Sequence, residues 1–273
     1  AMVAEVCAIA GTSGILGNCH ASGTEILQDL GAAHCETGQP ICYTSSDSVF
    51  QIAAHEQHFG LERLYDLCAK IAPRLHAMRV GRVIARPFAG GIGAFERTGN
   101  RKDYAMTPPQ PVLSNWLQDA GHPVIGIGKI SDIFSGQGLD HSLTGSDMVL
   151  MQHLKDQFAQ AADGSFVFAN FVEFDSLYGH RRDVAGYARA LEWFDRALVS
   201  LLAAMKPDDL LILTADHGNA PTWPGTDHTR ERVPVLCAGM GPKPLGLLGF
   251  EDVAATVATY LNVTPKGQGK SFL

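Results

Sequence analysis

The sequence has 273 residues, of which 46% are hydrophobic and 18% charged, and this composition excludes disordered and fibrous proteins. The 28 acidic side chains outnumber the 21 Lys and Arg side chains, so the formal net charge is −7 and binding to a nucleic-acid backbone is not expected. The first 60 residues contain no Lys or Arg, so the positively charged start of a secretory signal is missing. The uncharged run 6–24 is too polar to span a membrane. The six cysteines form no C-x-x-C pair, and we interpret them as reduced thiols of a cytoplasmic protein.

The first part of the chain is predicted to mix helices and strands. The capping-box pattern Ser22-Gly-Thr-Glu25 predicts a helix that begins at Ser22. Apolar residues recur at helical spacing over 61–71, and strands are predicted over 40–44 and 80–87. The stretch 88–111 is rich in Gly, Pro and polar residues, and it is the best candidate for a domain boundary.

After this stretch, short apolar strands alternate with amphipathic helices. Strands are predicted over 123–128, 165–172 and 209–214, and helices over 147–158, 187–205 and 251–261. The longest of these helices, 187–205, carries Leu191, Phe194, Leu198 and Leu201 on one face. Such alternation predicts a buried, mostly parallel sheet, so the expected fold class is α/β.

Side chains of types that bind metal ions follow two of these strands. They are Asp175, His180, Asp216, His217 and His228. In open α/β sheets, ligands bind beyond the carboxyl ends of the strands. Carboxylate together with imidazole suits Zn²⁺, Mn²⁺ or Fe²⁺ better than Ca²⁺ or Mg²⁺. A single Asp-His pair is more often a capped turn, but several such groups after consecutive strands favour a metal centre, because burying them without a cation is costly.

Several segments resemble the phosphopentomutase family of the alkaline-phosphatase superfamily. The long motif 214–234 resembles the family signature, and shorter matches lie at 17–26, 43–49, 80–87, 127–132 and 175–182. The resemblance extends over essentially all 273 residues. It implies an alkaline-phosphatase-like core with a mostly parallel sheet and a smaller α+β cap domain. We expect the substrate-covering cap at residues 1–108 and the C-terminal part of the metal-binding core at 109–273.

The resemblance also implies two Mn²⁺ ions. Asp216 and His217 match ligands of one ion, and Asp175, His180 and His228 match ligands of the other. Two cations about 3.5–4 Å apart can clamp a transferring phosphoryl group and offset its charge.

Three further residues match family positions that contact the sugar phosphate, namely Asp47, Arg82 and Lys129. Arg and Lys are suitable phosphate partners, although without the motif we would interpret these two as solvated cations. The implied reaction interconverts the 1-phosphate and 5-phosphate of ribose or deoxyribose through a phospho-Thr enzyme, with a sugar bisphosphate as primer. The expected partner is therefore a pentose phosphate.

The sequence departs from the family pattern in one respect. In the family, a core strand with a further Asp ligand and the phosphorylated Thr precede the cap domain, and no segment here matches either. We therefore expect a chain that lacks roughly the first hundred residues of the family, has an open sheet edge, supplies no catalytic nucleophile of its own and is weakly active or inactive.

Two alternatives stay open on the sequence alone. One is a related metal-dependent phosphatase or phosphoglycerate mutase on the same core, and the other is a non-catalytic fragment. The motif His55-Glu-Gln-His58 lacks the H-E-x-x-H spacing of zinc proteases, and we interpret it as a solvated helix end. The scattered cysteines are interpreted as small core residues.

Overall fold

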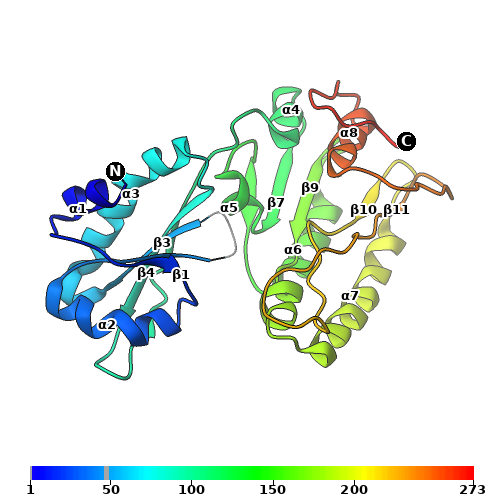
Figure 1. Ribbon diagram of the computed structural model, residues 1–273. Coiled ribbons are helices and arrows are strands. Elements are labelled where there is room, and N and C mark those ends of the chain that lie inside the picture. Colours follow the sequence, from blue (N-terminus) through cyan, green and yellow to red (C-terminus); the bar gives the residue numbers. More distant parts are fainter. Residues whose placement is uncertain (1, 46–48) are drawn as a thin grey trace. The chain divides into compact units, whose positions relative to one another are not determined.

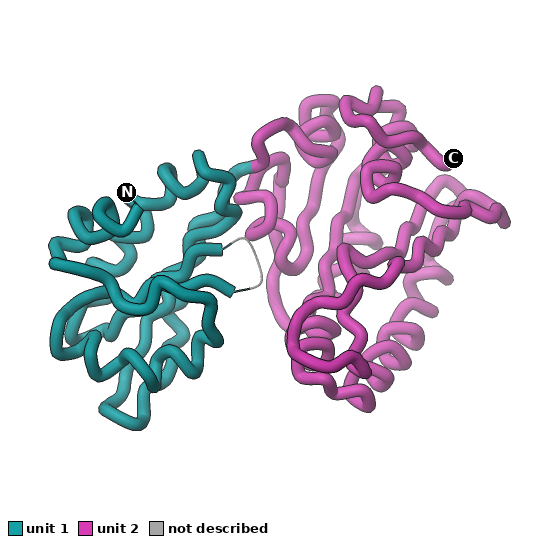
Figure 2. The backbone as a smooth tube through the Cα atoms, viewed as in Figure 1, with its two compact units in different colours: residues 1–107 teal, residues 108–273 magenta. Residues whose placement is uncertain are grey.

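The chain folds into two compact units, residues 1–107 and 108–273 (Figure 2). The computed structural model describes residues 2–45 and 49–273. Among the described helices, none is both long and apolar enough to cross a membrane. The predicted role of the first unit as a cap over the substrate stays a prediction.

Unit 1 is built on a six-stranded mixed sheet in the order β1-β2-β3-β4-β5, with β6 paired to β4. The strands are β1 (Leu16–His20), β2 (Ile41–Thr44), β3 (Val49–His55), β4 (Arg82–Ala89), β5 (Glu96–Arg97) and β6 (Lys102–Ala105). The helices are α1 (Met2–Ala10), α2 (Glu25–Thr37), the π-helical turn η1 (Glu56–Gly60) and α3 (Leu61–Ala77). Helices α1 and α3 cover one face of this sheet, and α2 covers the other (Figure 1).

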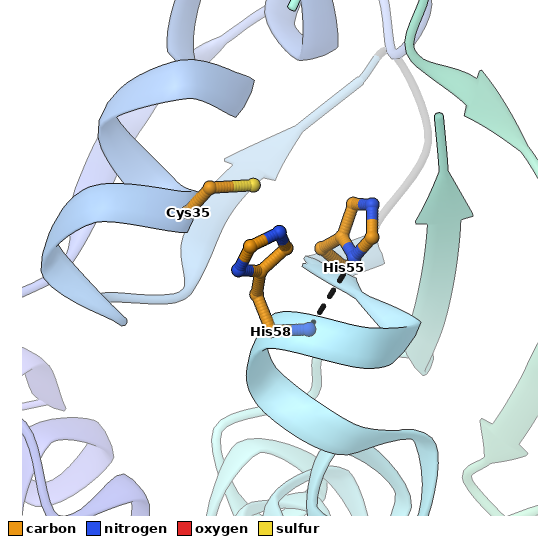
Figure 3. Close-up of side chains that lie close together, drawn as sticks. All are labelled: Cys35, His55 and His58. Carbon is orange, nitrogen blue, oxygen red and sulfur yellow. Dashed lines mark hydrogen bonds between the residues drawn. The ribbon is translucent and has the colours of Figure 1, made fainter. Parts of the chain in front are cut away.

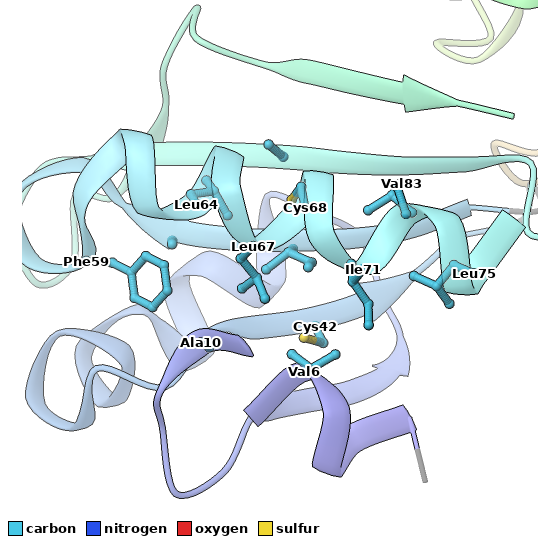
Figure 4. Packing of buried hydrophobic residues seen from close by; sticks show 14 residues of the cluster. Val6, Ala10, Cys42, Phe59, Leu64, Leu67, Cys68, Ile71, Leu75 and Val83 are labelled. Carbon is cyan, nitrogen blue, oxygen red and sulfur yellow. The ribbon is translucent and has the colours of Figure 1, made fainter. Parts of the chain in front are cut away.

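The central strands of unit 1 are apolar on both faces because both faces are covered. Cys42 in β2 packs in the cluster under α1 and α3, whereas its neighbours Ile41 and Tyr43 pack in the cluster under α2. This alternation follows from the period of two residues in a strand. On the α3 side, Leu67 and Ile71 are 1% and 0% exposed, and they pack among the apolar side chains that Figure 4 shows.

Helix α2 begins three residues later than the capping-box pattern predicted, and that prediction was wrong. Helix α2 starts at Glu25, and its N-cap, Thr24, makes no side-chain capping bond. The Ser22 hydroxyl pairs instead with the Thr24 hydroxyl at 3.1 Å. The Ser22 side chain is therefore engaged locally rather than with the third residue of a helix.

Unit 2 contains a three-stranded parallel sheet in the order β8-β7-β9, and a separate antiparallel pair, β10-β11. The strands are β7 (Val124–Gly128), β8 (His141–Leu143), β9 (Phe166–Asn170), β10 (Leu211–Leu213) and β11 (Leu236–Ala238). The helices are α4 (Leu113–Asp119), α5 (Ile130–Phe134), α6 (Asp147–Gln160), the π-helical turn η2 (Phe174–Gly179), α7 (Val184–Ala204) and α8 (Phe250–Tyr260). The fold is therefore mixed α/β with parallel strands at its centre. The strand predicted over 209–214 is β10, and among the described residues it pairs antiparallel with β11 alone, so its expected place in the parallel sheet was wrong.

The parallel sheet of unit 2 is also covered on both faces. Val124 of β7 packs with side chains from α4 and α8, whereas Ile125 and Ile127 pack with Leu150 of α6. Helix α7 departs from the predicted apolar face: Leu198 is 7% exposed, but Leu191 is 51% exposed. Only the C-terminal half of that face is buried in the part of the chain that the structure describes.

Candidate metal centre

Three of the predicted metal ligands converge beyond the ends of β9 and β10. Asp175 lies in the π-helical turn η2 that follows β9, and His217 and His228 lie in the loops that follow β10. Each of the three side chains offers a ligand atom, and these atoms all lie within 4.8 Å of one another. The ends of the two strands therefore bring together carboxylate and imidazole groups that are far apart in the sequence.

The Asp175 carboxylate lies between two imidazoles. Its Oδ1 atom is 3.3 Å from His228 Nε2, and its Oδ2 atom is 3.3 Å from His180 Nε2. The His228 ring stacks on the ring of His217 at 3.7 Å between centroids and on the ring of His180 at 4.8 Å. The structure thus adds His180 to the group formed by Asp175, His217 and His228.

Asp216 lies at the margin of this group. Its Oδ2 atom is 3.6 Å from His217 Nε2, and its side chain is 70% exposed. The resemblance assigns Asp216 and His217 to one ion, but the geometry places His217 nearest to the ring of His228, which the resemblance assigns to the other. The division of the five residues between two ions stays a prediction.

The hydrogen bond at His180 Nδ1 shows which ring nitrogen carries the proton and which one can bind a metal. His180 Nδ1 lies 2.5 Å from the carbonyl oxygen of Thr226, which can only accept, so Nδ1 carries a proton. In a neutral imidazole, Nε2 then presents a lone pair to the Asp175 carboxylate. Two electron-rich atoms at this distance need a cation between them or a second proton on the ring. The donor set therefore fits a bound metal ion.

Arg182 forms hydrogen bonds with all three segments that carry the predicted ligands. Its backbone has φ +54°, an uncommon conformation for a residue with a side chain. Its guanidinium donates to the Asn219 side-chain oxygen at 2.6 Å and to backbone carbonyls of four residues: Gly179, Ala220, Gly225 and Asp227. Sequence reasoning missed this role, because two consecutive arginines in a loop are typical of a solvated surface.

Asn219 connects Arg182 to Asp175 through two hydrogen bonds. The residue is 7% exposed, and its Nδ2 atom donates to Asp175 Oδ1 at 2.6 Å. Since arginine only donates, the amide must turn its oxygen to Arg182 and its NH₂ group to Asp175. Arg182, Asn219 and Asp175 therefore form a chain of hydrogen bonds with a single consistent direction.

Asp147 anchors the segment that leads into η2. Its carboxylate accepts the backbone N–H groups of Val172 and Glu173 at 3.1 and 3.2 Å, and the residue is 5% exposed. Burial, with a smaller contribution from the Glu173 carboxylate, raises the pKa of Asp147 to about 6.

Comparisons with known proteins identify the family. Residues 3–265 match the Metalloenzyme superfamily. The chain is 54% identical to the phosphopentomutase of Allorhizobium ampelinum over 277 residues, which cover 100% of this chain and 68% of the relative. It is 53% identical to the phosphopentomutase of Sinorhizobium medicae over the same shares of both chains. The chain belongs to the phosphopentomutase family. This membership decides against the alternative of a related phosphatase or phosphoglycerate mutase.

Solved structures also match this chain, at lower similarity. The PH0037 protein of Pyrococcus horikoshii matches 76% of this chain and 66% of its own length, with a TM-score of 0.44 and 16% identity.

Of the residues predicted to contact the sugar phosphate, the structure describes one in each unit. Arg82 lies in β4 of unit 1, with its guanidinium 3.9 Å from the Asp103 carboxylate. Lys129 is exposed and caps α5 in unit 2. Asp47 lies outside the described residues. The roles of all three in substrate binding stay predictions.

Proposed function

We propose that this chain acts in the phosphopentomutase reaction and that its centre around Asp175 holds the divalent metal ions, with Mn²⁺ as the metal. The reaction interconverts the 1-phosphate and 5-phosphate of ribose or deoxyribose, and a sugar bisphosphate primes it. The observation that carries the proposal is the placement of the Asp175 carboxylate at 3.3 Å from two imidazole nitrogens, in a chain of this family.

The proposed ligands are Asp175, His180, Asp216, His217 and His228. Bound divalent cations polarise a phosphoryl group and offset its negative charge. The two carboxylates compensate the charge of the cations, and the backbone carbonyl on His180 Nδ1 holds Nε2 towards Asp175. Arg82 and Lys129 are proposed to bind the phosphate of the sugar, the arginine through its planar fork and the lysine as a point charge. No residue of this sequence is proposed as the phosphoryl-carrying nucleophile.

Calorimetric titration with Mn²⁺ tests the metal centre directly. The wild-type chain is expected to bind Mn²⁺, and Asp175→Asn is expected to weaken binding by about tenfold or more, because the carboxylate faces two of the other ligands. Asp195→Asn makes the same chemical change at an exposed position of α7 and serves as the control. Equal Mn²⁺ affinity in the two variants would contradict the assignment.

Conversion of ribose 1-phosphate to ribose 5-phosphate, with Mn²⁺ and a bisphosphate primer, tests the catalytic part separately. Because no residue of this sequence is proposed as the nucleophile, the chain is expected to convert little or no substrate, even when Mn²⁺ is bound at Asp175. Turnover at the rate of an ordinary enzyme, about 1–10³ s⁻¹, would contradict this expectation, because the sequence would then have to supply a nucleophile of its own.

A further inference from the structure

A second cluster of metal-type side chains lies within unit 1. Cys35 projects from α2, His55 is the last residue of β3, and His58 lies in the π-helical turn η1 (Figure 3). Each side chain offers one ligand atom, and these atoms all lie within 4.8 Å of one another. His55 is 2% exposed, Cys35 is half-buried and His58 is exposed, so the cluster is open to solvent on the side of His58.

The position of His55 differs from the solvated helix end that the sequence predicted. His55 ends β3 opposite Phe88 of β4, and its backbone N–H donates to His34 Nε2 at 2.9 Å. Its ring makes edge contacts with the rings of Phe88 and Phe95, at 5.3 and 6.2 Å between centroids. The ring is thus held on a strand and between aromatic side chains, and only the His58 half of the motif is solvated.

The hydrogen bonds of His55 leave one nitrogen suited to a metal. Nε2 lies 3.0 Å from the carbonyl oxygen of Gly90, so Nε2 carries the proton and Nδ1 carries the lone pair. A backbone carbonyl on one ring nitrogen is the usual way in which proteins orient a metal-binding histidine. Nδ1 accepts only long bonds, of 3.2 and 3.4 Å, from the backbone N–H groups of Gln57 and His58. Both residues are exposed, so water can replace these bonds.

We propose that Cys35, His55 and His58 form a site for a divalent metal of borderline softness such as Zn²⁺ or Co²⁺, with water as the fourth ligand. Thiolate and imidazole are both ligand types that these metals accept, whereas the centre around Asp175 contains no sulfur ligand. Bond lengths of about 2.0–2.3 Å to a tetrahedral ion require ligand atoms closer than the present limit of 4.8 Å, so the exposed His58 ring and the Cys35 side chain close in on the metal. On binding, a metal–sulfur bond forms, the S–H bond of Cys35 breaks, and the proton leaves to the buffer.

Titration of the whole chain with Co²⁺ in a thiol-free reducing buffer tests this site without reference to catalysis. Thiolate ligation of Co²⁺ produces a ligand-to-metal charge-transfer band in the near ultraviolet, which carboxylate and imidazole ligands do not produce. The wild-type chain is expected to show this band. Cys35→Ser is expected to abolish it, and His58→Asn is expected to weaken Co²⁺ binding by about tenfold or more.

Two controls separate this site from the rest of the chain. Cys19→Ser changes an exposed cysteine outside the cluster, and Asp175→Asn changes the other centre. Both are expected to keep the band of the wild-type chain, which also makes the result independent of the proposed function. Absence of the band in the wild-type chain, or its persistence in Cys35→Ser, would overturn the proposal.

Discussion

Replacing Arg182 tests whether the ligand loops of the Asp175 centre are held by long-range hydrogen bonds rather than by the sheet alone. The guanidinium joins residues that lie 37–45 positions away in the sequence to the loop that follows η2. Removing it releases Asn219, which orients Asp175, and at the same time frees the loop that carries His228. The Arg182→Ala variant is therefore expected to bind Mn²⁺ more weakly, although Arg182 itself is no ligand.

The size of the effect follows from the burial of the acceptors. Gly225 and Asp227 are exposed, so water replaces the guanidinium at their carbonyls with little loss. The remaining acceptors are the Asn219 side chain and the carbonyls of Gly179 and Ala220, on buried or half-buried residues. At about 1 kcal/mol for each hydrogen bond, the loss is about 3 kcal/mol. This corresponds to a roughly 100-fold weaker affinity, at the upper end of the range for residues that orient metal ligands.

Calorimetry with Mn²⁺ on a short series of variants measures this loss. Arg182→Lys is expected to recover little, because an ammonium group cannot reach acceptors on several sides with a planar fork. Arg182→Gly removes the same side chain and also removes the backbone strain at this position. The left-handed conformation costs a non-glycine residue about 1–2 kcal/mol, and glycine avoids this cost. It therefore separates backbone strain from hydrogen bonding. Arg181→Ala, at the exposed neighbouring position, is the control.

A double-mutant cycle with Asn219→Ala tests the chain of hydrogen bonds itself. If Arg182 acts on Asp175 through Asn219, the double variant should lose less Mn²⁺ affinity than the two single losses added together. Binding by Arg182→Ala within about twofold of Arg181→Ala would refute the reasoning, because the loops would then be ordered without the guanidinium.

Three further outcomes are expected, each checked by chemical denaturation. Burial raises the pKa of Asp147 from 3.8 to about 6, so the free energy of unfolding falls as pH rises from about 4 to 6 and Asp147 ionises. Asp147→Asn should remove about 3 kcal/mol of this fall, whereas the control Asp156→Asn, on the same helix, should remove none of it. Ile71→Ala should lower the free energy of unfolding by about 2–5 kcal/mol, whereas Ile92→Ala, at an 83% exposed side chain, should change it by less than about 0.5 kcal/mol. Gly128→Ala should destabilise the chain more than Gly241→Ala: both glycines have positive φ, but only at Gly128 would a Cβ atom lie 2.2 Å from the Asn170 carbonyl oxygen.

Much of unit 2 could be predicted from hydrophobic pattern, because its central elements are long and regular. The apolar strands that became β7 and β9 and the helices α6, α7 and α8 all follow the predicted order along the chain. The pattern could not predict that β10 would pair only with β11, since periodicity shows which residues are buried and not which strands pair. It also could not predict that Leu191 would be exposed, since that depends on which elements pack against α7.

The proximity of Asp175 and His217 could be predicted because each lies shortly after the end of a strand. Asp175 and His217 are placed by β9 and β10, and their chemistry is visible in the residue types. Arg182 and Asn219 were missed because their roles consist of contacts between loops, at sequence separations of 37 and 44 residues. Such contacts leave no periodic signal, and the left-handed backbone of Arg182 is visible only in the structure.

The two histidine clusters of the chain show why the residue type alone does not separate a ligand from a structural histidine. In both, a backbone carbonyl holds one nitrogen of a ring, at Thr226 for His180 and at Gly90 for His55, so the other nitrogen presents a lone pair. What the lone pair faces then differs. At His180 it faces a carboxylate, an arrangement that is unfavourable without a cation or a proton, whereas at His55 it accepts two long backbone hydrogen bonds that a metal must displace. The centre around Asp175 therefore has the stronger physical requirement for a bound ion.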